Sequence, residues 1–406
     1  MARVQLVLNA GSSSLKFQVF LDDGADVPNR IYRGLFEGLG TDPHFKVRDH
    51  EGAIAGEERW PRDTAFGFEE ALAHLSDWLS AHRGGHQLTG VGHRVVHGGP
   101  NYTHAVRLTP EIIAELDTLS PLAPLHQPRS LEPIRIIARR VPGLPQVAAF
   151  DTAFHRTMPE MAQLFAIPQS LTDAGVKRYG FHGLSYAYLA TQFPKVDERL
   201  ARGRVIAAHL GSGASLCAYQ ASRSLATTMG FSAIDGLMMG TRCGTIDPGV
   251  VFYLQRELGM SAAEAEHFLY TKCGLLGVSG ISNDMRELRE RAEAEPGARR
   301  AIDLFVYRIN REAGSLVAAL GGIDGLVFTA GIGENDPATR AEVVTALRWA
   351  GFELDAEANR AGATRITRGD GPQAYVIPTD EEWTIVREMR AVLAEGTTSI
   401  ERPVAG

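Results

Sequence analysis

The feature that most constrains the fold is an apolar run that stops at a Gly/Ser cluster and continues as a second apolar run. Residues 4–20 have this layout, and residues 205–219 repeat it 200 positions later, so that Asn9 corresponds to His209 and Gly11 to Gly211. The layout predicts a strand, a tight turn and a second strand. Its recurrence favours an internal duplication, although short Gly/Ser hairpins also recur by chance. Duplicated hairpins would provide two phosphate-binding turns that face one another across a cleft.

A third apolar run, residues 325–335, predicts a buried strand, then a Gly-x-Gly turn, then a helix from about Pro337. Apolar residues at helical spacing predict further helices over residues 69–83, 301–320 and 381–394. Strands that alternate with helices indicate an α/β fold. A domain boundary is expected near residue 150, and the tail after Gly396 is expected to fray.

The composition narrows the class of protein. A length of 406 residues predicts two or three domains, and a formal charge of −7 without a basic run argues against binding to nucleic acids or anionic membranes. The three cysteines lie outside any CxxC pair, which argues against a disulfide framework and a zinc site. The first apolar run ends at Asn9, too early for a signal peptide, and none reaches the ~20 residues of a membrane helix. These features fit a cytoplasmic protein.

Two arginines lie in glycine-rich segments and are candidates for anion binding. Arg94 lies within residues 90–99, and Arg242 lies within residues 236–249. A guanidinium group binds carboxylates and phosphates through two parallel hydrogen bonds. A structural salt bridge is the commoner role of an arginine, so the pattern alone leaves both roles open.

Two histidines and two acidic segments complete the candidates. His182 precedes a glycine and His126 ends a proline-constrained loop, but a lone histidine is more often structural than catalytic. Asp151 follows a buried strand, where open α/β sheets place ligand chemistry, and it fits a helix cap equally well. Residues 378–382 fit a capping box as well as an oxygen ligand for magnesium. Six other histidines are expected at the surface: His44, His50, His74, His82, His86 and His104.

Several common motifs are absent from the sequence. There is no Walker A sequence, no GxGxxG after the first strand and no GxSxG. These absences argue against a P-loop enzyme, a Rossmann fold and a serine hydrolase.

Taken together, the segments resemble acetate kinase and, more broadly, the short-chain acyl kinases. They follow the family's order over nearly the whole chain, and the ordered set is far more specific than any one of its members. The similar segments are residues 9–16 (NAGSSSLK), 92–99 (GHRVVHGG), 122–126 (LAPLH), 150–155 (FDTAFH), 178–183 (RYGFHG), 209–211 (HLG), 236–242 (GLMMGTR), 247–249 (DPG), 328–335 (FTAGIGEN) and 378–382 (PTDEE).

The resemblance implies an α/β fold of two ribonuclease H-like domains with a nucleotide cleft between them, as in the acetate and sugar kinase, chaperone ATPase and actin superfamily. The first domain would comprise residues 1–150 together with a C-terminal helix at about 385–406, and the second residues 151–384. The implied reaction is reversible transfer of a phosphoryl group from ATP to acetate, giving ADP and acetyl phosphate. Magnesium, or manganese in its place, and a homodimeric assembly are implied as well.

The resemblance also implies roles for individual residues. Arg94 and Arg242 would hold the acetate carboxylate and the phosphoryl group, while His182 would donate a hydrogen bond and His126 would assist. Asp151 and Glu381 would position magnesium, and Asn9 is a further metal candidate. The walls around the acetate methyl group would be Val96, Leu125, Phe181 and Ala233. The residues implied to hold ATP are Asn9, Ser12, Ser14, Lys16, His209, Gly211, Ser212, Gly213, Asp284, Met285, Arg286, Gly331, Ile332, Gly333 and Asn335.

The chain departs from the family's usual pattern at several of these segments. The substituted positions are Gln127 and Ser212 for asparagine, Tyr186 for histidine, Ala226 and Thr245 for aspartate, and Ala233 for proline. Because alanine is a smaller wall than proline, propionate stays an alternative acceptor. One methylene is worth only ~1–3 kcal/mol of discrimination.

The chemistry of the implied acceptor bears on the role of Asp151. A carboxylic acid with a pKa of ~4 to 5 is ionised at neutral pH and needs no general base. The site must instead supply positive charge, because two anions approach one another and the transferred group carries charge on its equatorial oxygens. We therefore expect Asp151 to orient magnesium or other groups, and the phosphoryl group to pass directly, in line, to the acceptor.

Overall fold

The computed structural model describes residues 3–11, 13–25, 27–82 and 87–395. The chain forms two compact units, a first unit of residues 1–153 and 380–406 and a second unit of residues 154–379. Each unit is built on one β-sheet. The α/β class and the two-domain organisation are thereby confirmed. The assignment of residues 1–150 with 385–406, and of 151–384, to ribonuclease H-like domains stays a prediction.

The sheet of the first unit has the strand order β5-β4-β3-β2-β1-β6-β8-β7. Strands β1 to β5 pair antiparallel in succession, whereas β6 pairs parallel to β1 and β8 parallel to β6. Its strands are β1 (Arg3–Ala10), β2 (Leu15–Leu21), β3 (Arg30–Glu37), β4 (His44–Asp49), β5 (Ile54–Arg59), β6 (Gln87–Val95), β7 (Val106–Arg107) and β8 (Gln146–Phe150).

The sheet of the second unit has the strand order β11-β10-β9-β12-β13. Strands β9, β10 and β11 pair antiparallel, β12 runs parallel to β9, and β13 runs parallel to β12. This order and these directions match those of β3-β2-β1-β6-β8, so the predicted duplication extends from one hairpin to a five-stranded sheet. The strands are β9 (Arg204–Leu210), β10 (Ala214–Gln220), β11 (Arg223–Thr227), β12 (Gly325–Thr329) and β13 (Gln373–Val376).

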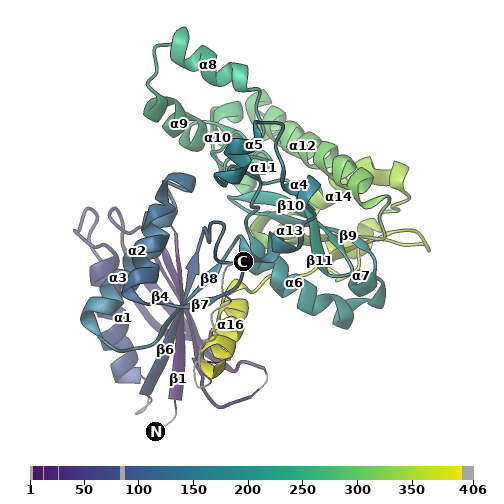
Figure 1. Ribbon diagram of the computed structural model, residues 1–406. Coiled ribbons are helices and arrows are strands. Elements are labelled where there is room, and N and C mark those ends of the chain that lie inside the picture. Colours follow the sequence, from purple (N-terminus) through teal and green to yellow (C-terminus); the bar gives the residue numbers. More distant parts are fainter. Residues whose placement is uncertain (1–2, 12, 26, 83–86, 396–406) are drawn as a thin grey trace. The chain divides into compact units, whose positions relative to one another are not determined.

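Helices cover both faces of the first sheet (Figure 1). Helices α1 and α3 pack on one face over a core that includes Leu75, Ile136 and Phe17, and α16 packs on the other. Glycine at position 92 lets α16 approach closely, because a Cβ there would lie 2.7 Å from Ile385 Cγ2. The helical segments of this unit are α1 (Phe68–His82), α2 (Pro110–Thr118), η1 (Ser120–Leu122), α3 (Gln127–Arg140) and α16 (Glu381–Glu395).

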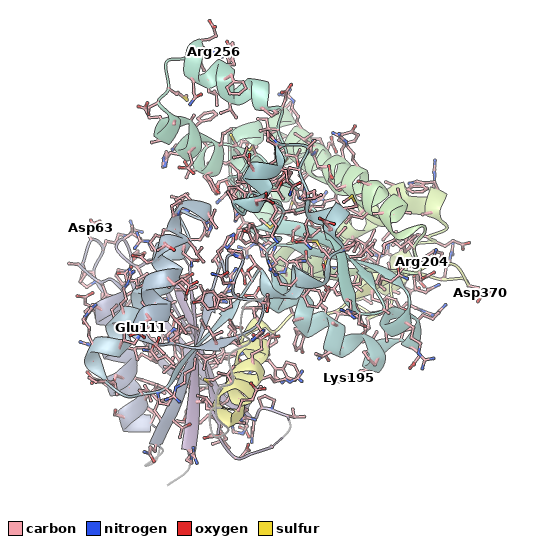
Figure 2. The ribbon with its side chains drawn as sticks, in the orientation of Figure 1. Asp63, Glu111, Lys195, Arg204, Arg256 and Asp370 are labelled. Atoms are coloured by element: carbon pink, nitrogen blue, oxygen red, sulfur yellow. The ribbon has the colours of Figure 1, made fainter. Side chains whose placement is uncertain are left out.

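The second sheet lies between α6 and α7 on one face and the long helix α12 on the other. Charged side chains such as Lys195 and Arg256 extend outward from this unit (Figure 2). Its helical segments, with the linking η2, are η2 (Ala153–Thr157), α4 (Glu160–Gln163), α5 (Gln169–Asp173), α6 (Gly183–Val196), α7 (Glu198–Arg202), α8 (Pro248–Arg256), α9 (Ala262–Thr271), α10 (Gly274–Ser279), α11 (Met285–Arg291), α12 (Pro296–Leu320), α13 (Ala330–Asn335), α14 (Pro337–Ala346), η3 (Leu347–Ala350) and α15 (Ala356–Arg360).

The local predictions hold in most places and fail in two. The three predicted helices correspond to α1, α12 and α16. Arg83, His86, which was expected at the surface, and the tail after Gly396 lie outside the described residues. The predicted Gly-x-Gly turn is instead the short helix α13. Its start is held by Glu334 Oε1, which accepts hydrogen bonds from the Ala330 and Thr379 backbone N–H groups at 2.8 and 3.2 Å.

His44 is the second failure, because it is buried rather than at the surface. Its two ring nitrogens each lie 2.9 Å from a carboxylate oxygen, one of Glu37 and one of Glu57. A polar ring is stable in the interior when both nitrogens have partners. Within the part of the chain that the structure describes, no helix is long and apolar enough to cross a membrane.

Candidate functional site

In the first unit the candidate side chains gather where three neighbouring strands end. Asn9, Arg94 and Asp151 lie at the carboxyl ends of the parallel strands β1, β6 and β8. Open α/β sheets place ligand chemistry at this edge. The Arg94 guanidinium forms an ion pair with Asp151. Its Nε donates to both carboxylate oxygens at 3.0 and 3.1 Å, and its Nη2 donates to Oδ2 at 2.6 Å.

Asn9 connects this ion pair to the start of α16. Its Oδ1 accepts a hydrogen bond from Arg94 Nη1 at 3.2 Å, and its Nδ2 donates to Glu381 at 3.1 Å and to Glu382 at 3.0 Å. Asp380 caps the helix, because its Oδ1 accepts from the Trp383 backbone N–H at 3.0 Å. Residues 378–382 therefore contain a helix cap, but it is a single Asp380 cap with Trp383 at the third position rather than the expected capping box. Glu381 and Glu382 are turned to the strand ends.

Burial and charge act against one another in this cluster. Burial alone would lower the pKa of Arg94, but the negative charges of Asp151 and Glu381 outweigh it and raise that pKa above its ordinary value. Burial raises the pKa of Asp151, and the guanidinium opposes that rise. Burial and the neighbouring Glu381 likewise raise the pKa of Glu382. Arg94 is therefore permanently charged and compensates a group of buried carboxyls.

The remaining candidates of the first unit differ in their surroundings. Val96 is buried, whereas Leu125 is 42 % exposed. His126 stands at the N-terminus of α3, and Gln127, one of the departures, holds the backbone of His97 with hydrogen bonds in both directions, at 3.0 and 3.1 Å. The hairpin turn is closed by the Gly11 backbone N–H donating to Ser14 O at 2.8 Å. Ser12 lies outside the described residues.

In the second unit His182 occupies a special backbone position. It has φ 58°, in the left-handed region, and it immediately precedes α6. Its Nδ1 lies 2.8 Å from Ser215 Oγ, and that hydroxyl lies 2.5 Å from Tyr186 Oη. All three side chains are buried. Burial raises the pKa of Tyr186 well above its ordinary value, so the phenol keeps its proton.

Arg242 and His182 converge on one glycine. A Cβ on Gly213 would lie 3.0 Å from Arg242 Nη2 and 3.1 Å from His182 Nε2. Arg242 Nη1 donates to the Ala233 carbonyl at 2.6 Å. The Gly211–Gly213 turn is closed by the Gly211 N–H donating to Gly213 O at 3.0 Å. The turn thus presents backbone next to a guanidinium and an imidazole.

His209 and Phe181 stand beside His182. The ring of His209 stacks on that of His182 with centroids 4.2 Å apart, and its Nδ1 lies 2.9 Å from Ser185 Oγ. Phe181 is buried, and its carbonyl oxygen lies 2.9 Å from His155 Nε2. Burial lowers the pKa of His155 to about 4, so this ring is neutral and donates from Nε2. The backbone that carries His182 is therefore fixed from both sides.

The loops predicted to hold the nucleotide come together within the second unit. A Cβ on Gly211 would lie 3.7 Å from Ala330 Cβ and 3.9 Å from Gly331 N. Gly240 N donates to Ser212 O at 3.0 Å, and the Gly240 position also lies against Asn283. Within this group Gly331 has open space around its Cα, and Asn335 Nδ2 donates to Gly331 O at 2.9 Å.

The residues at the start of α11 and α13 complete this group. Asp284 caps α11 by accepting from the Arg286 N–H at 2.8 Å, and the Arg286 side chain is 88 % exposed. Met285 is buried, as is Gly333, whose Cβ would lie 3.4 Å from the Phe328 backbone. Ile332 lies on the same short helix. Asp284 and Met285 therefore have structural contacts, which leaves Arg286 and Gly331 as the more accessible members.

The departure at position 245 has a structural role. Thr245 Oγ1 donates to Asp235 Oδ1 at 2.7 Å and accepts from Gly236 N at 3.2 Å. Arg178 Nη1 donates to the carbonyls of Thr228 and Met229 at 3.1 and 2.9 Å, and it lies 3.3 Å from Asp235 Oδ2. Arg178 and Thr245 thus both hold the loop that runs from the end of β11 to Arg242.

Sequence reasoning missed the residues that support these groups. Glu382 was passed over although it is adjacent to Glu381, and Gln18 was passed over although it lies on the same strand face as Lys16. Ser215 and Tyr186 could have been found only by folding β10 against α6, because they lie 29 residues apart. Period-two spacing from Lys16 to Gln18 was the one available signal.

The donor set of the first unit fits magnesium better than a softer metal. Among the described residues no cluster of three or more His, Cys, Asp or Glu side chains could hold a metal ion alone. Magnesium is usually bound through one or two carboxylates together with phosphate oxygens and water. Glu381 and Asp151 offer hard carboxylate oxygens. Both polar atoms of Asn9 have partners within the network, which makes it the weaker candidate.

Comparison with known proteins gives consistent matches. The model of the acetokinase family matches residues 4–387. The chain is 51 % identical over 396 residues to an acetate kinase of Rhodopseudomonas palustris, covering 96 % of this chain and 98 % of the relative. It is 48 % identical over 398 residues to an acetate kinase of Nitrobacter hamburgensis, covering 98 % of both chains.

Two solved structures are similar over nearly their full length. A propionate kinase from Francisella tularensis has a TM-score of 0.88 and 34 % identity, covering 96 % of this chain and 100 % of that one. The Porphyromonas gingivalis acetate kinase has a TM-score of 0.82 and 35 % identity, covering 97 % of this chain and 100 % of that one.

Proposed function

The chain belongs to the acetokinase family, and from that premise we propose that it transfers the γ-phosphoryl group of ATP reversibly to acetate, forming ADP and acetyl phosphate. The main structural support for phosphoryl transfer is that Arg242 Nη2 and His182 Nε2 both lie next to the Gly213 turn. A guanidinium and an imidazole at a glycine turn suit the equatorial oxygens of a transferring phosphoryl group.

The hydrogen bonds of His182 support its role as a neutral donor. Tyr186 Oη lies 2.5 Å from Ser215 Oγ, which lies 2.8 Å from His182 Nδ1, and we assign Tyr186 as the donor to Ser215 and Ser215 as the donor to His182. An imidazole whose Nδ1 accepts carries its proton on Nε2. His182 thus offers an N–H group on the side of Gly213 and Arg242, and it does so without needing a positive charge.

The contacts of Asp151 agree with a positioning role. Both carboxylate oxygens accept from Arg94, so this group orients the guanidinium and would position magnesium through water rather than as a direct ligand. Acetate is already ionised at neutral pH and needs no base. Arg94 then orients the acetate carboxylate, with Val96, Leu125, Phe181 and Ala233 around the methyl group and His126 assisting.

Magnesium would be held by Glu381 and Asp151 together with the nucleotide's phosphate oxygens. When bound, it neutralises charge on the β- and γ-phosphates. Lys16 and the two Gly/Ser turns, at Gly11 and Gly211–Gly213, bind the phosphate chain. Arg286, Gly331 and Asn335 would hold the adenosine. The phosphoryl group passes directly from ATP to the carboxylate oxygen, without a phospho-enzyme.

The function is tested by trapping the product. Incubation of the purified chain with ATP, magnesium and acetate should yield acyl phosphate that hydroxylamine converts to a hydroxamate. ATP hydrolysis without hydroxamate would instead indicate an ATPase, and the proposal would be wrong. A chiral γ-phosphate should be transferred with inversion, and retention would reveal a covalent intermediate.

Propionate is the second candidate acceptor. Ala233 is a small, buried residue beside Arg242, and one similar structure is a propionate kinase. The ratio of kcat/KM for acetate to that for propionate separates the two. Ala233→Pro should raise this ratio by about 10-fold, since one methylene contributes ~1–3 kcal/mol.

We also propose that the enzyme is a cytoplasmic homodimer. The second unit exposes apolar side chains on α8 and α12, among them Phe252 at 51 %, Tyr253 at 55 % and Tyr307 at 60 %. Exposed aromatic side chains are enriched at protein interfaces. Light scattering should give a dimer mass for the wild type and a monomer mass for Phe252→Asp/Tyr253→Asp.

A further inference from the structure

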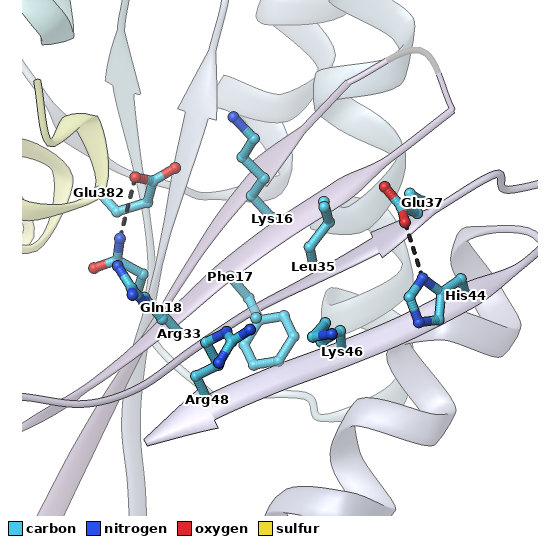
Figure 3. A pocket seen from close by; sticks show the side chains of 11 residues that line it. Lys16, Phe17, Gln18, Arg33, Leu35, Glu37, His44, Lys46, Arg48 and Glu382 are labelled. Atoms are coloured by element: carbon cyan, nitrogen blue, oxygen red, sulfur yellow. Dashed lines mark hydrogen bonds and ion pairs between the residues drawn. The ribbon is translucent and has the colours of Figure 1, made fainter. Parts of the chain in front are cut away.

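A cavity in the first unit lies on the face of strands β2, β3 and β4. It has a volume of about 280 Å³, and its lining side chains come mainly from these three strands (Figure 3). The strand register arranges them in two rows. Lys16 is directly opposite Leu35, which is opposite Lys46, and Gln18 is opposite Arg33, which is opposite Arg48.

Positive charge predominates among these side chains. Lys16, Arg33, Lys46 and Arg48 line the cavity, together with the carboxylates Glu37 and Glu382. Each carboxylate already has a partner, because Glu37 Oε1 lies 2.9 Å from His44 Nδ1 and Glu382 accepts from Asn9 and Gln18 at 3.0 and 3.3 Å. Of the cations, Lys46 is paired with Glu57, its Nζ lying 3.3 Å from Oε1.

The two arginines are the least compensated groups. Arg33 and Arg48 stand directly opposite one another on antiparallel strands, an arrangement that destabilises a sheet when the charges are alike. Arg48 Nη1 donates to the Gly52 carbonyl at 2.7 Å, a neutral partner. Arg33 is exposed, and no carboxylate pairs with it in the described part of the chain. A bound anion would relieve this repulsion.

We propose that this cavity binds a small polyanion that carries two phosphoryl groups, of the inorganic diphosphate class. Neighbouring positions on one strand face are about 7 Å apart, and the long side chains of Arg33 and Arg48 from one row and of Lys16 from the next can converge across that distance on the two adjacent phosphoryl groups of one diphosphate. Arginine forks and lysine ammonium groups are the usual phosphate ligands. A volume of about 280 Å³ lies at the lower end of the range for ligand pockets and suits a small anion.

The site has a consequence for catalysis, and this step rests on the proposed function. Lys16 lines the cavity and is also assigned to the nucleotide phosphates. An anion that holds the Lys16 ammonium withdraws it from ATP. Diphosphate at this cavity therefore weakens ATP binding and acts as a regulator of the enzyme.

The binding test uses the whole chain and inorganic diphosphate. Titration calorimetry on the wild type should reveal two classes of site, one in the transfer site and one in this cavity. Arg33→Gln/Arg48→Gln should weaken the second class at least 10-fold, and its affinity should fall with added salt. Arg59→Gln, an exposed arginine on β5 outside the cavity, is the matched control and should bind as the wild type does. Equal binding by the double variant and this control would overturn the proposal.

The kinetic arm separates this inference from the proposed function. Diphosphate should raise the KM for ATP in the wild type, and the double variant should keep its basal kcat and KM but lose at least part of this inhibition. Cavity binding without acyl phosphate formation would refute the function and leave the site intact. Inhibition that is identical in the wild type and the double variant would refute the regulatory role.

Discussion

The two units hold their candidate side chains in different ways. In the first unit a chain of charged contacts runs from Asp151 through Arg94 and Asn9 to Glu381. In the second unit the hydrogen bonds around His182 run to hydroxyl groups, and Arg242 donates to a backbone carbonyl. We therefore expect the stability and activity that depend on the first unit to fall when a charge is removed. Activity that depends on the second unit should fall when a small side chain is added at its glycine turn.

Removal of the Arg94 guanidinium should have the largest effect. Arg94→Ala leaves Asp151 buried without its counter-charge, which costs about 3–5 kcal/mol of unfolding free energy. It also removes positive charge from the transition state, and kcat/KM should fall by about 10³-fold. Denaturant unfolding and the hydroxamate assay measure the two effects.

A double variant separates stability from catalysis in the first unit. Arg94→Ala/Asp151→Asn no longer buries an unpaired charge and should recover much of the lost stability while staying inactive. If the double variant regained activity, the guanidinium would serve only the fold. An unchanged kcat/KM in Arg94→Ala would contradict the role of Arg94 altogether.

A methyl group at the glycine turn should have the next largest effect. In Gly213→Ala the new Cβ would meet Arg242 Nη2 at 3.0 Å and His182 Nε2 at 3.1 Å, and both groups must shift. Displacement by a few tenths of an ångström to 1 Å costs about 10- to 100-fold in kcat. Steady-state kinetics measure this loss.

Gly314→Ala is the matched control for the turn. It adds the same methyl group to α12 in the same unit, where the nearest side-chain atom is Trp349 Cζ2 at 3.9 Å, an ordinary contact. It should keep full activity and gain slightly in helix stability. Equal rates for the two variants would show that the turn tolerates displacement and would remove the contrast between the units.

How far each unit's candidate side chains could be predicted from the sequence follows the same contrast. The sites on strand ends were predictable, because Asn9, Arg94 and Asp151 each follow or end a recognisable apolar run, and parallel strands share one edge. The hairpin at residues 4–20 and its copy predicted a duplicated strand–turn–strand, whereas the extension of the repeat to three further strands is seen only in the structure. These inferences need only periodicity and sheet geometry.

The remaining parts depend on tertiary packing. The left-handed backbone of His182 and the Ser215–Tyr186 hydrogen bond arise only when α6 lies against β10. His44 was expected at the surface because strand periodicity does not reveal that two carboxylates flank its ring. The α13 helix was predicted as a turn because the role of Glu334 as its anchor depends on Thr379, 45 residues away.

Loss of the Tyr186 hydroxyl should have a smaller effect. Tyr186→Phe leaves Ser215 free to reorient, so that the Nδ1–H tautomer of His182 becomes accessible. We expect kcat to fall about 3- to 10-fold, with KM for ATP nearly unchanged. Nitrogen NMR of His182 should show an increased fraction of Nδ1–H, a change that a purely structural defect would not produce.

Two further variants sharpen the interpretation of Tyr186. Tyr186→His restores the residue usual in the family and should return most of the lost rate. Tyr188→Phe is the control, because Tyr188 lies two residues further along the same helix and outside the hydrogen bonds that join Tyr186, Ser215 and His182. His182 should keep its wild-type tautomer in this variant. A normal tautomer in Tyr186→Phe would refute the proposed orientation of the hydroxyl groups.

The smallest effect on activity is expected at Glu388, a carboxyl of the first unit that lacks the compensation given to Asp151. Its Oε2 is buried without a hydrogen-bond partner in the described residues. Burial raises its pKa from 4.5 to about 7, against the opposing charge of Arg387. The folded chain therefore holds a proton that the unfolded chain releases between about pH 4.5 and pH 7, and the unfolding free energy should fall as pH rises through this window.

Glu388→Gln should abolish this decrease and stabilise the chain by about 1–3 kcal/mol at pH 8, with kcat unchanged. Glu395→Gln, at the exposed end of the same helix, should keep the wild-type slope, and an equal slope in Glu388→Gln would show that this carboxyl is solvated after all.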